Sequence, residues 1–301
     1  MPIESEPRSV RMILNGTDTR EGAGFHVRRP FPGRVVDELD PFLLLDEMGP
    51  MEVGPGEARG APDHPHRGFE TVTYLLAGEM EHRDSHGNAG TLRPGDVQWM
   101  TAGAGVVHSE EPTARFLAEG GRMHGFQLWV NLPRRDKLAR PRYQDLRAAA
   151  IPLVSSDDGR THVRVLAGEA LGAAAPTRTH TPMLYLHVSL AAGGRLLQPV
   201  PADWTAFAWV FEGRLRAGRE RRIARVGQLV VLAGDGDAAL LEADEETGPS
   251  QALLVAGAPI GEPIARYGPF VMNTEDELRE AFEDYRAGRM GAIEAERVDG
   301  E

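Results

Sequence analysis

The 301-residue chain contains no cysteine. Disulfide bonds, thiolate metal sites and cysteine nucleophiles are therefore excluded, and a metal ion would have to be bound by nitrogen and oxygen ligands. The chain also lacks an apolar run of about 18 residues, the length of a membrane span. Its first residues, MPIESEPRSVRMILNG, contain no apolar stretch of signal-peptide length. We therefore expect a cytoplasmic protein with no membrane partner.

Positive charge is also scarce, because 33 Lys and Arg residues face 45 Asp and Glu residues and give a formal net charge of -12. A surface of this sign repels phosphate backbones, so direct binding to nucleic acid is not expected. The length allows either one large domain or two ordinary ones, and both can bury a core.

Glycine and proline are abundant and separate short apolar runs such as TVTYLLAG, VQWMTAG, FQLWVNL, LYLHVSL, FAWVFEG and QLVVLAG. This spacing is typical of an all-β sandwich or barrel. Only residues 134–147 and 274–289 have helical patterns. The second segment has a capping box of Thr274 and Glu277 and can end at Gly288, and one face carries Leu278, Ala281, Phe282 and Tyr285. The first carries Arg134, Arg135 and Lys137, which we interpret as the solvated face of a linker rather than a phosphate patch.

An internal repeat divides the chain. TYLLAGEM at 73–80 recurs in form as AWVFEGRL at 208–215, and RPGDVQWMTAGAG at 93–105 is echoed by RVGQLVVLAGDG at 225–236. The repeat predicts one β-barrel design written twice. We expect one domain over residues 1–140 and a second over residues 141–301, which includes the terminal helix.

The chain has ten histidines, and two of them lie two residues apart at His64 and His66, just before β-forming sequence. Residues two apart on a strand point to the same face. His108 and Glu110 repeat this spacing, so two strands can enclose one cation. Three imidazoles and one carboxylate suit Fe, Ni, Mn, Co or Cu in six-coordinate geometry, which leaves up to two positions for water, substrate or O₂. Zinc is a further option, and ordinary hydrogen-bonded histidines are the alternative interpretation.

Other polar residues of the first half are given weaker roles. His82 is interpreted as a structural histidine near the cavity, His86 as part of an exposed turn, and Gln127 as a candidate for the cavity floor. His124 has no assigned role. We assign four large apolar side chains to the core: Trp99, Met100, Phe126 and Trp129.

The second half has no equivalent metal set. Alignment of the repeats places His64 and His66 on Pro199 and Pro201. It places His108 near Ala239 or Leu240 and Glu110 near Leu241 or Glu242, so the H-x-E pair is not retained. The remaining histidines there are scattered and are expected to be structural: His162, His180 and His187.

Long segments resemble the pirin family, whose members are bicupins with two double-stranded β-helix, or jelly-roll, barrels in one chain. The resemblance rests on DPFLLLDEMGP, on residues 64–110, on FQLWVNLP and on residues 261–291. It implies one divalent metal per chain, usually Fe(II), bound in the N-terminal cupin by residues matching His64, His66, His108 and Glu110. Glu70 matches a glutamate of the general cupin pattern, and we assign it a supporting or structural role.

The resemblance also implies a function. Some pirin-like proteins look like quercetin 2,3-dioxygenases, which use O₂ to open a flavonol ring with release of carbon monoxide. The partners would then be a small aromatic substrate and O₂, and Glu110 would accept the substrate hydroxyl proton. The alternative is an iron- and redox-dependent regulatory protein that binds a transcription factor or a metabolic enzyme. A third option is another cupin reaction, or a metal that is retained without being used.

Overall fold

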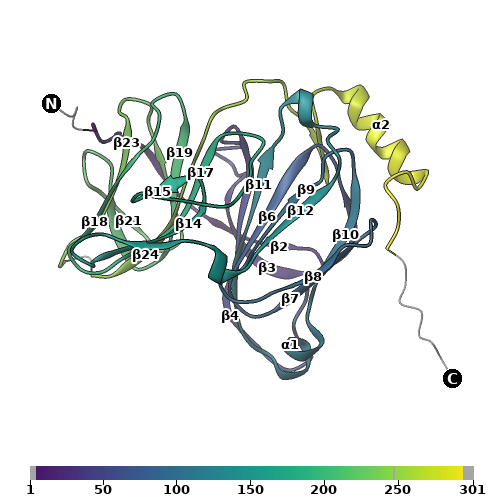
Figure 1. The fold of residues 1–301 in the computed structure, drawn as a ribbon, viewed down its shortest axis with the longest axis horizontal. Coiled ribbons are helices and arrows are strands. Elements are labelled where there is room, and N and C mark those ends of the chain that lie inside the picture. Colours follow the sequence, from purple (N-terminus) through teal and green to yellow (C-terminus); the bar gives the residue numbers. More distant parts are fainter. Residues whose placement is uncertain (1–4, 247, 294–301) are drawn as a thin grey trace. The chain divides into compact units, whose positions relative to one another are not determined.

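The computed structural model describes residues 5–246 and 248–293, and strands dominate it (Figure 1). The chain divides into two compact units. Unit 1 contains the residues up to Asp18, then Arg28–Leu45 and Leu146–Ile260, whereas unit 2 contains Thr19–Val27, Asp46–Asp145 and the residues from Gly261 onward. The all-β prediction with a helix near the C-terminus is confirmed.

Unit 2 is built from a seven-stranded and a four-stranded sheet. The larger sheet has the order β12-β9-β6-β11-β4-β3-β2, and the smaller one has the order β5-β10-β7-β8. Strands β2, β3 and β4 each have residues in both units. The bounds are β2 Thr17–Glu21, β3 Phe25–Phe31, β4 Phe42–Val53, β5 Ala61–His66, β6 Phe69–Ala77, β7 Met80–Asp84, β8 Ala89–Leu92, β9 Val97–Thr101, β10 Val106–Pro112, β11 Gly121–Asn131 and β12 Arg142–Leu146.

Short elements complete unit 2. Helix α1 covers Ala114–Glu119, the 3-10 helix η1 covers Arg134–Asp136, and the hairpin of β25 (Ala265–Tyr267) and β26 (Phe270–Met272) leads into helix α2 (Glu275–Arg286).

Unit 1 has the same design. Its larger sheet has the order β1-β22-β19-β24-β17-β14-β13, its smaller sheet has the order β18-β23-β20-β21, and β15 pairs with β16. The bounds are β1 Val10–Asn15, β13 Leu153–Ser155, β14 Thr161–Ala167, β15 Glu169–Ala170, β16 Ala173–Ala174, β17 Met183–Leu190, β18 Gly194–Pro199, β19 Thr205–Glu212, β20 Arg214–Ala217, β21 Arg222–Arg225, β22 Gln228–Leu232, β23 Ala238–Ala243 and β24 Ser250–Gly257, with a 3-10 turn η2 at Ala148–Ala150.

The two sets of sheets match strand for strand, which agrees with the sequence repeat. In each, the strands that carry the repeated motifs lie side by side: β6 next to β9, and β19 next to β22. The edge strands do not follow a single cut at residue 140, however. Strand β1 precedes the first repeat yet pairs with β22 of unit 1, and β12 precedes the second repeat yet lies beside β9 of unit 2. Sheet pairing therefore distributes the chain differently from a division into residues 1–140 and 141–301.

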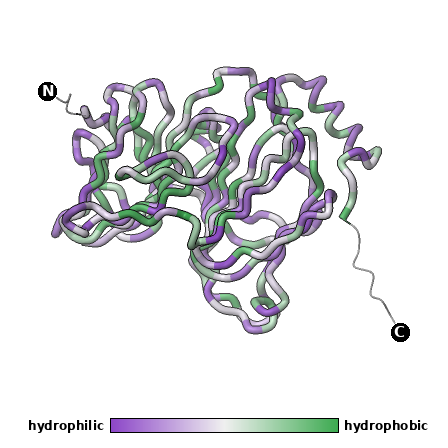
Figure 2. Tube along the Cα trace, viewed as in Figure 1, coloured by the Kyte–Doolittle hydropathy of each residue, from purple (hydrophilic) through white to green (hydrophobic). Residues whose placement is uncertain are grey.

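Helix α2 belongs to unit 2 and forms as its sequence predicts. The Thr274 side chain accepts from the Glu277 N–H, and the Glu277 side chain accepts from the Thr274 N–H, so the capping box is complete. Leu278 and Ala281 are buried in a cluster with apolar residues of β10, β25 and β26. Tyr285 is 39% exposed, so the end of the predicted stripe faces solvent. Figure 2 shows that most positions of this helix are hydrophilic, as expected for a surface helix.

The predicted helix over residues 134–147 is wrong. Only Arg134–Asp136 form a single 3-10 turn, and Arg142–Leu146 form the edge strand β12. Pro141 lies between the two segments and lacks the N–H that a continuous helix would need. The assignment of Lys137 to a solvated face is also wrong, because this residue is only 1% exposed.

The buried Lys137 ammonium joins three parts of unit 2. Its Nζ donates to the Gly68 carbonyl at 2.9 Å, to Asn131 Oδ1 at 2.7 Å and to the Val271 carbonyl at 3.0 Å. Burial lowers the pKa of Lys137 to about 8, so the ammonium form still predominates at pH 7. The residue thereby ties the turn between β5 and β6, and strand β11, to the C-terminal hairpin.

We expect Lys137→Met to destabilise the protein by about 3 kcal/mol or more, because three buried acceptors lose their donor. A thermal or urea melt measures the change. The control is Arg135→Met, which removes a nearby side chain that is 77% exposed and should change stability by about 0.5 kcal/mol or less. Equal melting curves for the two variants would contradict the structural role of Lys137.

Unit 1 contains an extended cluster of buried apolar residues. This cluster includes Leu196, Leu215, Ala239, Leu241 and Leu254. The smaller sheet of unit 2 instead carries the buried side chains of His66, His82, Asp84, His108 and Glu110. Buried polar groups need partners or a ligand, so this difference directs attention to unit 2.

None of the helices in the described residues is both long and apolar enough to span a membrane.

Candidate metal centre

Two neighbouring strands bring three histidines together. His64 and His66 lie at the end of β5, and His108 lies on β10, which pairs antiparallel with β5. The register places His108 opposite His64 and Val106 opposite His66. Side chains opposite one another on paired strands share a face, so the predicted convergence of the two strands occurs.

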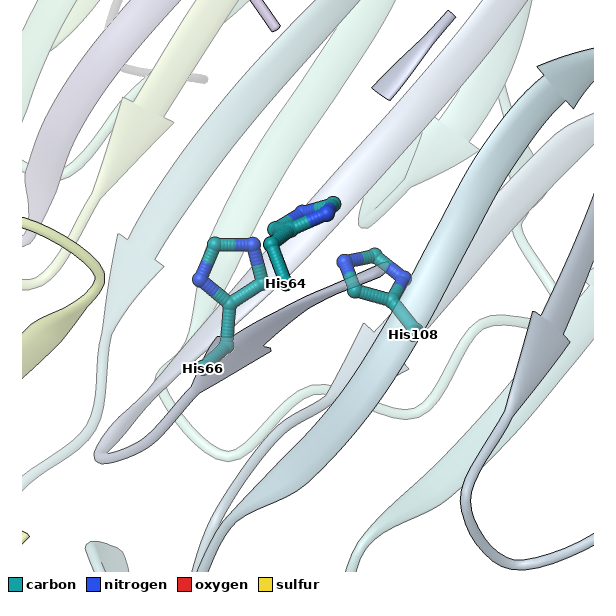
Figure 3. Close-up of side chains that lie close together, drawn as sticks. All are labelled: His64, His66 and His108. Carbon is teal, nitrogen blue, oxygen red and sulfur yellow. The ribbon is translucent and has the colours of Figure 1, made fainter. Parts of the chain in front are cut away.

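The three imidazoles point toward one another (Figure 3). One ring nitrogen from each of His64, His66 and His108 can be chosen so that all lie within 4.8 Å of one another. The ring centroids are 4.7 Å apart for His64 and His66, 4.3 Å for His64 and His108, and 5.0 Å for His66 and His108. Metal–nitrogen bonds of about 2.0–2.1 Å place two ligand nitrogens at most about 4.2 Å apart, so one cation can bind all three rings after a shift of under about 1 Å per ring.

Backbone carbonyls orient two of the rings. Nδ1 of His64 is 2.7 Å from the Pro62 carbonyl, and Nδ1 of His66 is 3.4 Å from the Pro269 carbonyl. A carbonyl can only accept, so each bond places the ring proton on Nδ1 and leaves the Nε2 lone pair for a ligand. Histidines that bind metals are commonly oriented in this way.

His108 supplies the strongest sign that the site takes a ligand. It is 0% exposed, and within the described part of the chain neither of its ring nitrogens has a hydrogen-bond partner. Burial lowers the pKa of His108 well below its usual value, and the neighbouring His64 and His82 lower it further. Burial also lowers the pKa of His66, with His108 and His64 contributing and the Pro269 carbonyl opposing. Both rings are therefore neutral at pH 7, the form that binds metals.

Glu110 lies two residues beyond His108 on β10 but is not part of the close histidine group. It is 7% exposed, and each carboxylate oxygen accepts one hydrogen bond. Thr73 Oγ1 donates to Oε1 at 2.9 Å, and Gln127 Nε2 donates to Oε2 at 3.0 Å. A carboxylate has about four acceptor sites, so two sites stay available for a metal or a substrate proton. Ligation by Glu110 stays a prediction.

The C-terminal segment is attached directly beside His66. The Arg67 N–H donates to the Pro269 carbonyl at 3.3 Å, and the Val271 N–H donates to the Arg67 carbonyl at 3.0 Å. The Arg67 side chain forms a mostly buried salt bridge of 2.6 Å with Asp284 of helix α2. These contacts hold the carbonyl that orients the His66 ring.

His82 and Tyr143 form a second polar group near Glu110. His82 is 2% exposed and lies opposite Glu110 in the pairing of β7 with β10. Its ring stacks on Tyr143 with centroids 5.0 Å apart, and its Nε2 is 3.5 Å from Asp145 Oδ2. Burial raises the pKa of Tyr143, and the carboxylates of Asp84, Glu110 and Asp145 raise it further. The phenol therefore stays protonated and can act as a donor.

Several predicted positions lie away from the histidine group. Glu70 is fully buried and accepts from Thr101 Oγ1 at 2.7 Å. Glu70 and Thr73 are three residues apart on strand β6, so their side chains point to opposite faces of the sheet. Thr73 is the one that reaches Glu110. His124, which had no assigned role, forms a buried hydrogen bond of 2.9 Å between its Nε2 and Glu47 Oε1. His86 is exposed.

In unit 1 the strands equivalent to β5 and β10 are β18 and β23, and their register pairs Leu196 with Leu241 and Gln198 with Ala239. In the described residues the one close group of potential metal-binding side chains is that of His64, His66 and His108. Two histidines of unit 1 have polar side-chain partners: His162 contacts Ser155, and His187 contacts Gln251.

Sequence reasoning missed Thr73 and Tyr143. A signal for Thr73 existed, because Thr71 and Thr73 alternate with apolar residues in TVTYLL and mark a polar side of the strand. Tyr143 had no such signal once residues 134–147 were interpreted as a helix. Gln127 was proposed for the cavity floor, and the structure shows it donating to Glu110.

Known proteins similar to this chain cover nearly its whole length. A family model described as Pirin matches residues 24–130, and one described as Pirin C-terminal cupin domain matches residues 185–291. A pirin-like protein of Solanum lycopersicum is 42% identical over 289 residues, which are 96% of this chain and 95% of that protein. Pirin of Rattus norvegicus is 42% identical over 286 residues, 94% of each chain.

A solved structure gives the same result for the fold. The crystal structure of quercetin 2,3-dioxygenase from Acinetobacter baumannii is 37% identical in sequence, has a TM-score of 0.89, and covers 95% of this chain and 99% of its own. The match extends over both sets of sheets, so the two-barrel cupin prediction is confirmed. The chain belongs to the pirin family.

Proposed function

We propose that this protein is a metal-dependent dioxygenase of the quercetin 2,3-dioxygenase type, which acts on flavonol-like substrates with O₂. The observation that carries the proposal is the buried His108, whose ring nitrogens have no partner in the described residues although His64 and His66 lie close to it. The similarity to the Acinetobacter baumannii quercetin 2,3-dioxygenase supports the substrate class.

The metal centre we propose consists of His64, His66, His108 and Glu110, with one divalent ion per chain. Three imidazoles and a carboxylate fit Fe(II) well, and Ni, Mn, Co, Cu or Zn are alternatives. A bound ion would supply a Lewis acid that polarises a substrate oxygen, together with a position where O₂ chemistry can take place. The absence of cysteine fits a reducing compartment, and we propose the cytoplasm.

The protein residues bind and orient the substrate and move its proton. Trp129 and Phe69 form a tilted ring contact with centroids 4.4 Å apart, and Trp129 lies 5.2 Å from the His66 ring, so an aromatic wall borders the centre. A flat substrate ring can pack on such a wall. Glu110 is oriented by Thr73 and Gln127 and accepts the proton of the substrate hydroxyl.

The test is the stoichiometry of gas exchange. Protein loaded with Fe(II), and separately with Ni, Mn, Co and Cu, is mixed with quercetin, and O₂ uptake and CO release are measured together. We expect one CO for each O₂ consumed with at least one metal, because the ring carbon is lost as CO while both oxygen atoms enter the product. Bound metal without O₂ uptake would overturn the proposal and favour the regulatory alternative, in which the metal controls a protein partner.

A further inference from the structure

A pocket of about 320 Å³ opens in unit 2, and none of His64, His66, His108 and Glu110 lines it. Its walls come from β2, β3 and the turn between them, from β4, from residues 57–59, and from one residue each of β7 and β11. The volume lies at the small end of the range typical of ligand pockets, which is roughly 300–1,000 Å³.

The inner part of the pocket is lined by methionines. Met48, Met80 and Met123 are each less than 9% exposed, and Met51 is partly buried beside them. Phe25 adds an aromatic wall. Methionine side chains are flexible and polarisable, so they adapt to apolar molecules of different shape. The lining therefore favours an apolar body over water.

Charged side chains occupy the rim. Arg20 and Arg59 are exposed and line the pocket, together with Glu57. In both arginines Nη1 already donates to nearby backbone carbonyls. Arg20 Nη1 donates to the Gly24 carbonyl, and Arg59 Nη1 donates to the carbonyls of Gly56 and Ala58. Within the described ranges, 5–246 and 248–293, their other guanidinium N–H groups have no hydrogen-bond partner.

The one carboxylate at the rim is already engaged. Glu57 Oε2 accepts from the Gly54 N–H at 3.1 Å. Two cations against one carboxylate make the rim locally positive on a chain whose net charge is -12. A guanidinium with free N–H groups is well suited to a carboxylate.

We infer that this pocket binds an amphipathic anion, a molecule with an apolar body of about eight carbons and a single carboxylate. The body packs on Met48, Met80 and Met123, and the carboxylate accepts from Arg20 and Arg59. The inference is independent of the proposed function, because the pocket shares no lining residue with the metal centre.

The experiment uses the full chain labelled with ¹³C at the methionine methyl groups and equilibrated with Zn²⁺, which is diamagnetic. The chain has ten methionines, so the spectrum is simple, and single Met→Leu variants assign it. Octanoate is titrated in. We expect the Met48, Met51, Met80 and Met123 signals to shift together, while Met12 and Met183 of unit 1 stay unchanged.

Charge and space are tested separately. The double variant Arg20→Gln/Arg59→Gln should bind octanoate about tenfold more weakly, because two exposed charge contacts are lost. It should still bind octanol as wild type does, which shows that the pocket is folded. Ala23→Trp, at the exposed mouth, should weaken both ligands. Octylamine binding as tightly as octanoate, or octanoate shifting none of the four pocket methionines, would overturn the inference.

Discussion

Replacing His66 with alanine is expected to abolish stoichiometric metal binding. The variant removes one of three imidazoles whose nitrogens lie within 4.8 Å of one another, and the two that remain belong to different strands. Loss of a residue that only orients a ligand costs about 10–100-fold in metal affinity, so loss of a ligand should cost about 100-fold or more. Metal content per chain is measured after dialysis, with wild type expected to retain one equivalent.

Two other histidines of the same unit provide controls. His86→Ala removes an exposed imidazole, and His82→Ala removes a buried one outside the close group. Both should keep one metal per chain. A metal that binds the folded chain and not the unfolded chain stabilises the folded state. Added metal should therefore raise the melting temperature of wild type and of both controls, but not that of His66→Ala. Full occupancy in His66→Ala, or two equivalents in wild type, would contradict the single three-histidine centre.

The fold was largely predictable because its strands are short and its repeat is marked by glycine turns. TYLLAGEM and AWVFEGRL contain the ends of β6 and β19, two strands that take the same place in sheets of the same order. The edge strands were not predictable in this way. Residues 142–146 form a strand because they lie beside β9, a pairing between distant segments that local sequence does not encode. This pairing and that of β1 with β22 place two edge strands outside the halves that a cut at residue 140 would give them.

The histidines were predictable because a two-residue spacing fixes a common face on any strand, and the register of β5 with β10 completes the group. The contacts that surround the histidines could not be predicted from the sequence. The Pro269 carbonyl reaches His66 from a segment about 200 residues away in the chain, and Thr73 reaches Glu110 from another sheet. Such contacts depend on how separate elements pack, and spacing within one segment carries no information about them.

Glu110 is the carboxylate whose chemistry decides between a metal-binding protein and a dioxygenase. Its hydrogen bonds to Thr73 and Gln127 fix its orientation and leave acceptor sites open. Glutamine at this position keeps the shape of the side chain. Its carbonyl can still accept from Gln127, and its amide can donate to the Thr73 hydroxyl, so the variant should fold. Negative charge and basicity are the properties that are lost.

We therefore expect Glu110→Gln to keep most of its metal through the three histidines and to lose flavonol turnover by about 100-fold or more, the usual effect of removing a general base. Glu70→Gln is the matched control, because it makes the same chemical change at a buried carboxylate that accepts from Thr101 on the opposite face of β6. Its turnover should stay within about threefold of wild type, since the change is remote from the centre. O₂ uptake is expressed per bound metal ion, so that a loss of metal is separated from a loss of proton transfer. Wild-type turnover per metal ion in Glu110→Gln would refute the role of Glu110 as the general base. An equal loss of turnover in Glu70→Gln would show that the loss of any buried charge, rather than of the carboxylate at the centre, lowers the rate.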